Sequence, residues 1–193
     1  MTKVKEYQDY ETFSNYMEEK YPRMFKGRRY GGFAVGEGWY HILDQLCERI
    51  YSNIMWKRRS RAYDLLFNRA RARGKDSLIK FMSKGGKVQP WHITEAEESL
   101  ANSPRPVTDP IKHIHVEQIK EKFGGLRFYY QGGDEEIHGM VSMAEIWAGN
   151  VCEECGERGT RRSGGWVRTL CDVHEAERNA RIEEQCRKDG LEL

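Results

Sequence analysis

Apolar residues recur at intervals of three and four from Trp39 to Ile54, and this spacing is typical of an amphipathic helix. A second helix is predicted after it, because apolar residues from Tyr63 to Phe67 are followed by a break only at Gly74. Before Trp39, an aromatic segment predicts a short helix that ends before Pro22. The N-terminal half of the chain is therefore expected to be mainly helical.

Two further short helices are predicted in the middle of the chain. Asp76 is suited to cap the first of them, and Thr94 with Glu97 three residues later forms a capping box for the second. The residues after them exclude a helix, because proline lacks the backbone N–H that a helix needs and restricts the residue before it. These prolines are Pro104, Pro106 and Pro110, and they predict an extended linker.

After the linker the apolar period changes to two, which is typical of β-strands. Residues 111–122 predict one strand, with an irregularity at Glu117–Gln118 where the alternation slips. Gly124-Gly125 predicts a tight turn, and residues 126–130 predict the returning strand. Asp134 is then expected to cap a helix. The buried face of this helix is expected to hold Ile137, Met140, Val141, Ala144 and Trp147.

The last third of the chain carries two pairs of metal-ligating residues. Cys152 and Cys155 are separated by two residues, and so are Cys171 and His174. This spacing lets each pair reach one ion from a single turn, and thiolates with an imidazole are ligands that zinc prefers. A strand is predicted at 166–170, and the second pair is expected to begin a helix. A turn, a hairpin and a helix with these ligands resemble a treble-clef zinc finger that holds one structural Zn²⁺.

Together these elements predict an α+β protein in which helices pack on a small antiparallel β-hairpin or sheet, followed by a C-terminal treble-clef-like zinc module. Four segments are expected along the chain. Residues 1–56 form the N-terminal helical part of the main domain, and 57–110 form a basic helical insertion with its proline-rich linker. Residues 111–150 complete the main domain with a hairpin and a helix, and 151–193 hold the zinc module and a C-terminal helix.

Positive charge is concentrated in one segment, although the net charge of the 193 residues is only +2. From Lys57 to Lys87 there are eleven lysines and arginines against two aspartates. Such a segment is suited to bind an anionic partner such as a phosphate backbone, or else it is a solvated helix whose charge acidic neighbours balance. The candidate nucleic-acid contacts are Lys57, Arg58, Arg59, Arg61, Arg69, Arg71 and Arg73, together with Arg161, Arg162 and Arg168 beside the zinc ligands.

Two histidines suggest a second chemistry. His113 and His115 are two residues apart on a predicted strand, so their side chains are expected to lie on the same face, where they could serve a metal-dependent nuclease. No third histidine follows at a spacing known for nucleases, and no serine or cysteine stands in a nucleophile motif. The sequence therefore favours a protein without catalytic activity, with the nuclease as an alternative.

Several strings resemble a family of proteins encoded by tailed phages and prophages. They are Gly36–Trp39, Val116–Tyr130, Gly132–Asp134 and the zinc segment CEECG…GGW…TLCDVH. The resemblance covers about residues 20–56 and 104–178. The resemblance implies that this chain is a phage accessory protein. It also implies that the zinc ligands of the family are present here at all four positions, Cys152, Cys155, Cys171 and His174.

The expected function is that of a zinc-binding accessory protein that binds a host or phage protein, for example to inhibit a host defence or replication factor. Nucleic-acid binding is the first alternative. No small-molecule cofactor is expected. No membrane partner is expected either, because no apolar run approaches the roughly 18 residues of a membrane span. The chain has five cysteines, three of which stand with His174 at zinc spacing, and its start has no apolar leader, so a reducing cytosol is expected. The resemblance implies that this is the cytoplasm of a bacterial host.

Overall fold

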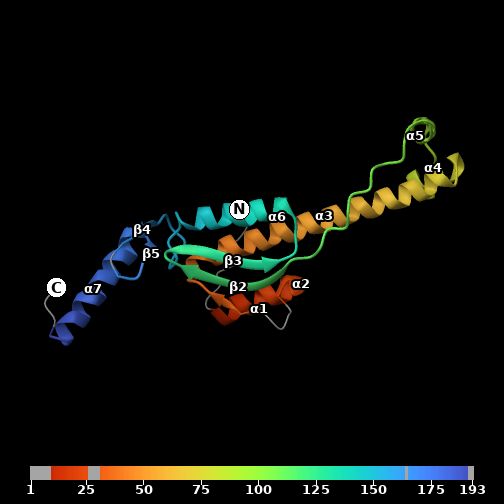
Figure 1. Ribbon diagram of the computed structural model, residues 1–193. Coiled ribbons are helices and arrows are strands. Elements are labelled where there is room, and N and C mark those ends of the chain that lie inside the picture. Colours follow the sequence, from red (N-terminus) through yellow and green to blue (C-terminus); the bar gives the residue numbers. More distant parts are fainter. Residues whose placement is uncertain (1–9, 26–30, 164, 191–193) are drawn as a thin grey trace. The chain divides into compact units, whose positions relative to one another are not determined.

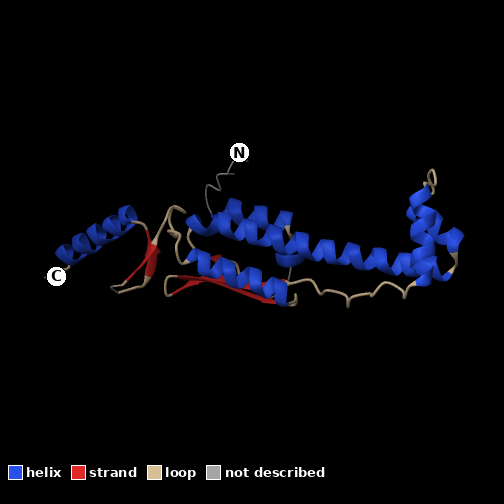
Figure 2. Cartoon of the chain, turned by 90° about the horizontal axis from the view of Figure 1, so that it is seen from above, coloured by secondary structure: helices blue, strands red, loops and turns tan. Residues whose placement is uncertain are grey.

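The computed structural model describes residues 10–25, 31–163 and 165–190 (Figure 1). Its contacts divide the chain into two compact units. Unit 1 combines Met1–Ser52 with Lys112–Leu193, and unit 2 is Asn53–Ile111. Helices and two small sheets make up these units, so the predicted α+β class is confirmed (Figure 2).

The larger sheet, in unit 1, has the strand order β1-β2-β3. Strands β2 (His115–Lys122) and β3 (Gly125–Gln131) are antiparallel, and their register shifts between Val116 and Gln118, where the irregularity was predicted. The turn between them is formed by Phe123 and Gly124, one residue before the predicted Gly124-Gly125, because Gly125 pairs with Lys122 in the sheet. Their φ angles of 53° and 74° are those of a type I′ hairpin turn. Strand β2 begins four residues later than the predicted 111, because β3 ends opposite His115 and offers no partner before it.

A third strand, β1 (Phe33–Ala34), pairs in parallel with β2. Its two residues are too few to produce a period of two, so the sequence pattern contained no signal for it. Helix α2 (Pro22–Phe25) packs on β2 and helix α6 (Glu135–Ala148) on β3. The short helix η1 (Glu37–Trp39) leads from β1 into the long helix α3 (Tyr40–Ala72).

Helix α6 begins where it was predicted, since Oδ1 of Asp134 accepts a hydrogen bond from the backbone N–H of Ile137 at 3.2 Å. Its predicted buried face is wrong at one position, because Trp147 is 63% exposed. Ile137, Val141 and Ala148 are the fully buried residues of the helix. Trp147 precedes Ala148 by one residue, which rotates it about 100° away from that row. The largest apolar side chain of α6 thus lies on the surface.

The core of unit 1 lies around the first turns of α3 and joins them to helix α1 (Tyr10–Lys20). The rings of Phe13 and Tyr40 are stacked at 3.9 Å between centroids, and Phe33 of β1 meets Phe13 edge-on at 4.9 Å. Along α3 the residues Leu43, Cys47 and Ile50 of this unit are fully buried, in agreement with the predicted apolar stripe. Burial raises the pKa of the Cys47 thiol, so this cysteine is a neutral core residue.

A buried carboxylate on α3 joins this helix to the end of α1 through hydrogen bonds. Asp44 is only 7% exposed, and its Oδ1 accepts hydrogen bonds from Nζ of Lys20 at 2.9 Å and from the hydroxyl of Tyr21 at 3.0 Å. The Tyr21 hydroxyl also donates to Glu48 at 3.0 Å. Burial and these two carboxylates raise the pKa of Tyr21 far above its usual value, so the phenol stays protonated as a donor.

Replacing this carboxylate tests its role. Asp44→Ala is expected to lower the free energy of unfolding by about 2–3 kcal/mol, because it leaves a partly buried ammonium and a buried hydroxyl with fewer partners. The loss is smaller than for a fully buried pair, since Lys20 is about one-third exposed. Urea denaturation followed by circular dichroism measures it. The control Asp76→Ala removes an exposed carboxylate and should change little; equal stability of the two variants would contradict the role given to Asp44.

Helix α3 corrects the predicted division of the N-terminal half. Residues 40–72 form one continuous helix, where two were expected. The apolar period lapses at Lys57–Ser60, but no glycine or proline interrupts the chain there, and lysine and arginine are good helix formers. Gly74, with φ 101°, follows the end of this helix, as predicted.

Unit 2 continues with α4 (Lys75–Met82) and α5 (Pro90–Ala101). Neither starts at its predicted cap. Gly74 precedes the first turn of α4, so Asp76 lies inside the helix. Helix α5 begins one turn before Thr94, because Pro90 is pre-organised for the first helical position and the capping box is formed by Gln89 and His92. A small core of Phe67, Ala70, Leu78 and Ala96 holds the three helices together.

Candidate metal centre

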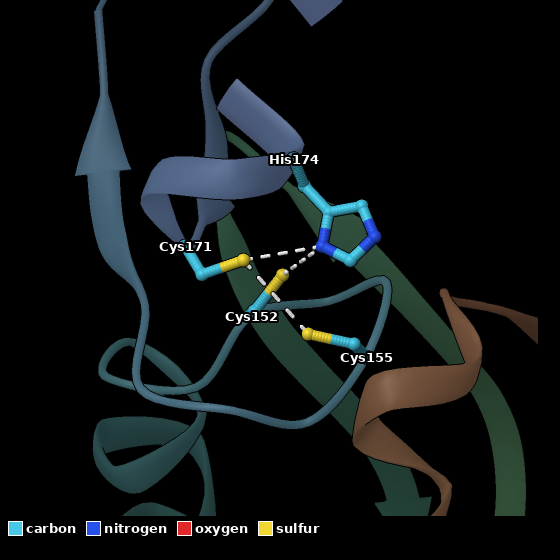
Figure 3. Close-up of side chains that lie close together, drawn as sticks. All are labelled: Cys152, Cys155, Cys171 and His174. Carbon is cyan, nitrogen blue, oxygen red and sulfur yellow. Dashed lines mark hydrogen bonds between the residues drawn. The ribbon is translucent and has the colours of Figure 1, made fainter. Parts of the chain in front are cut away.

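Three elements of the C-terminal segment bring four ligands together (Figure 3). Cys152 and Cys155 flank a tight turn, and the antiparallel pair β4 (Thr160–Arg162) and β5 (Arg168–Leu170) follows. Cys171 is the N-cap of helix α7 (Asp172–Lys188), and His174 lies in its first turn. Turn, hairpin and helix stand in the predicted order.

The separations between the ligand atoms fit one tetrahedral ion. All four atoms lie within 4.8 Å of one another. Nδ1 of His174 lies 3.5 Å from Sγ of Cys152 and 3.1 Å from Sγ of Cys171, and the sulfurs of Cys155 and Cys171 are 3.9 Å apart. A tetrahedral ion bound at zinc distances sets sulfur and nitrogen about 3.5 Å apart and two sulfurs about 3.8 Å apart. The group can therefore hold a metal ion.

Local electrostatics prepare one ligand for metal binding. The backbone N–H of His174 donates a hydrogen bond to Cys171 and lowers the pKa of this thiol to about 7. Burial and the neighbouring sulfurs instead raise the pKa of Cys155 to about 11. A divalent cation reverses this second effect, because a coordinated thiol is deprotonated. Metal binding therefore releases protons, and the metal affinity is expected to fall as the pH falls.

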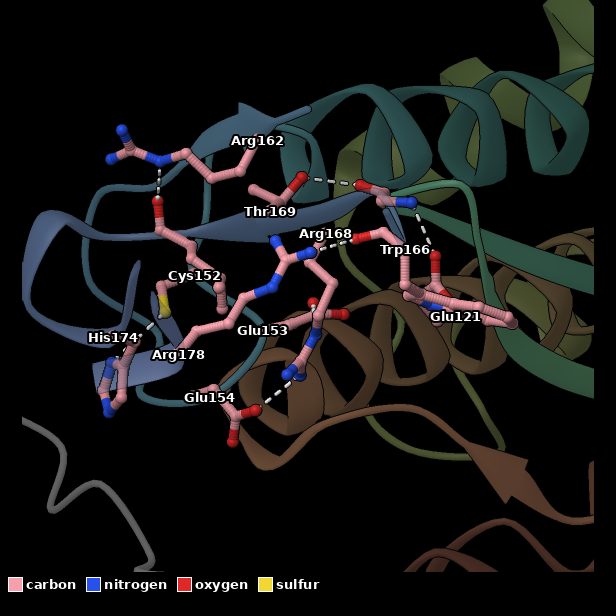
Figure 4. A network of polar contacts seen from close by, with 12 residues as sticks. Glu121, Cys152, Glu153, Glu154, Arg162, Trp166, Arg168, Thr169, His174 and Arg178 are labelled. Atoms are coloured by element: carbon pink, nitrogen blue, oxygen red, sulfur yellow. Dashed lines mark hydrogen bonds and ion pairs between the residues drawn. The ribbon is translucent and has the colours of Figure 1, made fainter. Parts of the chain in front are cut away.

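A network of polar contacts fixes the ligand-bearing turn to the hairpin β4–β5 (Figure 4). Nε of Arg168 donates to the buried carboxylate of Glu153 at 2.5 Å, and its Nη2 donates to Glu154. Burial raises the pKa of Glu153, and Arg168 opposes that shift. The backbone N–H of Glu153 also donates to the carbonyl of Thr169 at 3.0 Å. Both residues between the first two cysteines are thereby held in place.

The same hairpin contacts the large sheet. The hydroxyl of Thr169 donates to the carbonyl of Gly124 in the β2–β3 turn at 2.6 Å, and Nε1 of Trp166 donates to Glu121 of β2 at 3.3 Å. Helix α7 adds a further contact, since Nη2 of Arg178 donates to the carbonyl of Trp166 at 2.7 Å (Figure 4). The segment that carries the candidate ligands is thus an integral part of unit 1.

Two glycines allow the backbone of this segment to approach the rest of unit 1 closely. A Cβ atom on Gly36 would lie 2.0 Å from the carbonyl oxygen of Glu153, and one on Gly38 would lie 2.1 Å from that of Cys152. The φ angle of Gly36 is an ordinary −73°, so lack of space requires glycine there. Nε1 of Trp39 donates to the carbonyl of Val151 at 2.8 Å. The segment Gly36–Trp39 is therefore the platform on which the Cys152–Cys155 turn rests.

The predicted basic contacts in unit 2 fall into two groups. Arg58 and Arg71 serve the fold, because they donate hydrogen bonds to the carbonyls of Ile111 and of residues 99, 100 and 102. Lys57 and Arg61 are half-buried. In the part of the chain that the structure describes, the remaining side chains are exposed and make no ion pair or hydrogen bond; these are Arg59, Arg69 and Arg73.

The basic residues beside the metal ligands are divided in the same way. Arg162 pairs with Asp172 and donates to the carbonyl of Leu170, and Arg168 binds Glu153 and Glu154. Arg161 is exposed, and within the described ranges it has no ion-pair partner. Most of these arginines therefore stabilise the segment that carries the ligands.

The two candidate nuclease histidines differ in their surroundings. His115 is exposed at the start of β2, whereas His113 is half-buried and its Nε2 lies 3.1 Å from Nη1 of Arg23. Among the described residues, the one group of three or more candidate metal ligands is Cys152, Cys155, Cys171 and His174. The structure thus adds no third ligand to the histidine pair.

Sequence reasoning missed the platform and the Asp44 cluster. Both join residues that are far apart in the chain, so no local spacing indicates them. The glycines of Gly36-Glu-Gly-Trp39 were a visible signal, because two glycines before a helix can mark a close approach of backbones.

Searches against protein-family models, characterised proteins and solved structures find no match to this chain. Among the described residues no helix is long and apolar enough to cross a membrane.

Proposed function

We propose that Cys152, Cys155, Cys171 and His174 bind one structural Zn²⁺ in an accessory protein without catalytic activity. Three thiolates and an imidazole are ligands that zinc prefers, and four protein ligands close its coordination sphere. The ion then holds a glycine-rich segment on the platform Gly36–Trp39 and leaves no position for a substrate. The resemblance to proteins of tailed phages supports a place of action in the cytoplasm of a bacterial host.

We propose further that the protein acts by binding another protein of the host or the phage. The observation that carries this proposal is an exposed apolar row on α6, where Met143, Ile146 and Trp147 are each more than 60% exposed. Contiguous apolar surface of this kind, rich in tryptophan and methionine, is typical of protein interfaces. Nucleic-acid binding is the alternative, and the exposed side chains of Arg59, Arg69 and Arg73 favour it.

Fluorescence anisotropy with labelled duplex DNA and RNA separates the two functions. A protein-binding function predicts weak binding that disappears between about 50 and 200 mM salt, as expected for nonspecific phosphate contacts. Replacing Arg59, Arg69 and Arg73 together by glutamate should then leave binding of the partner protein intact. The control reverses Arg181 and Arg187 on α7. Tight binding at physiological salt that only the first variant abolishes would establish nucleic-acid binding in place of protein binding.

A further inference from the structure

An apolar groove of about 650 Å³ lies between the first turns of α3 and helix α6. The two helices lie side by side in both views of unit 1 (Figures 1 and 2). The lining residues follow the same spacing on both helices: a first residue, and then those one, four, five and eight positions after it. On α3 they are His41, Ile42, Gln45, Leu46 and Arg49, and on α6 they are Gly139, Met140, Met143, Ala144 and Trp147.

This spacing gives each helix a row of side chains along two turns, about 12 Å of helix length. Two such rows form the valley into which a third helix packs, with its own apolar residues between them. Gly139 widens the valley, since a Cβ atom there would have no neighbour within 4 Å. Met143 and Trp147 are 64% and 63% exposed, so the wall on α6 is available to a partner.

The charge at the groove selects the partner. Arg49 is an exposed cation in the lining, and among the described residues it has no carboxylate or hydrogen-bond partner. No aspartate or glutamate belongs to the lining. The adjacent carboxylate of Glu48 is bound instead by Tyr21 and Lys20. A carboxylate on an incoming helix would therefore find a cation without a competing partner, beside an apolar surface that strengthens the pair.

We propose that this groove binds an amphipathic helix of a partner protein, with apolar residues at i, i+3 or i+4, and i+7, and an aspartate or glutamate that pairs with Arg49. This inference rests on the proposed protein-binding function and specifies its surface. Methionine and tryptophan suit the role, because the flexible thioether adapts to different side chains and the indole supplies a large contact area.

Selection from a library of random displayed peptides against the intact, metal-loaded protein tests the proposal. Enriched peptides should carry the helical apolar spacing and an acidic residue. They should bind Met143→Glu at least tenfold more weakly than wild type, while Ile182→Glu, an exposed apolar residue on α7, should bind them like wild type. With Arg49→Glu, exchange of the peptide's acidic residue for lysine should restore binding.

Other outcomes would overturn the proposal. Enriched peptides that bind Met143→Glu as tightly as wild type would place protein binding at another surface, so the groove would fail while the proposed function stands. Peptides without helical spacing, or no enrichment at all, would also exclude a helix-binding groove. A wild-type dimer in sedimentation that Met143→Glu converts to a monomer would assign the groove to a second copy of this chain. Circular dichroism of each variant checks that it is folded.

Discussion

Cys155→Ser is expected to remove the metal ion and to unfold the segment from Val151 to the first turns of α7. The variant loses one thiolate of a closed set, and structural zinc contributes about 10 kcal/mol or more of apparent binding free energy to a folded site. The hydrogen bonds that hold this glycine-rich segment on the sheet and the platform each contribute only about 1 kcal/mol, far less than the ion. Zinc content by elemental analysis and limited proteolysis measure the two effects.

The matched control is Cys186→Ser, which changes the same chemical group on α7 outside the ligand cluster. It should keep one zinc per chain and the proteolysis pattern of wild type. If Cys155→Ser retained stoichiometric zinc, or lost zinc without a change in proteolysis, the ion would not be the element that organises this segment.

Gly38→Ala is expected to weaken zinc binding although it changes no ligand. The added Cβ would lie 2.1 Å from the carbonyl oxygen of Cys152 and 2.5 Å from the backbone nitrogen of Gly156. Both are backbone atoms of the ligand-bearing turn, so the turn itself must move away from its platform. Overpacking of this kind costs about 1–3 kcal/mol, and the backbone contacts place this case at the upper end. Thermal unfolding and competition with a chromogenic chelator measure the loss of stability and of metal affinity.

Gly139→Ala provides the comparison, because it adds the same methyl group to a helix surface where no atom lies within 4 Å. It should stabilise α6 by up to about 1 kcal/mol, as alanine does in place of glycine inside a helix. An unchanged melting temperature and zinc affinity in Gly38→Ala would show that the turn does not rest on Gly38.

The cluster of candidate metal ligands was predictable because each pair of ligands is local. Two residues separate Cys152 from Cys155, and Cys171 from His174, so the spacing alone indicates metal ligands. The same holds for the hairpin turn at Gly124 and for the cap at Asp134, whose partners lie within a few residues. The ligand pairs, the turn and the cap are determined by residues close together in the sequence, so contacts with distant residues change them little.

The platform and the groove were not predictable, because both depend on contacts across the chain. Trp39 reaches Val151 from 112 residues away. Trp147 continued the apolar pattern of α6 and was therefore assigned to the core, but the neighbours that cover the helix leave it exposed. Apolar spacing predicts that a helix has an apolar face, and it does not indicate whether that face meets the same chain or a partner.

X-ray absorption spectroscopy at the zinc K edge, on protein purified without chelators, tests the central claim most directly. One zinc per chain is expected, with three sulfur neighbours at about 2.3 Å and one nitrogen neighbour at about 2.0–2.1 Å. Folded protein without metal, or a first coordination shell dominated by oxygen, would contradict it.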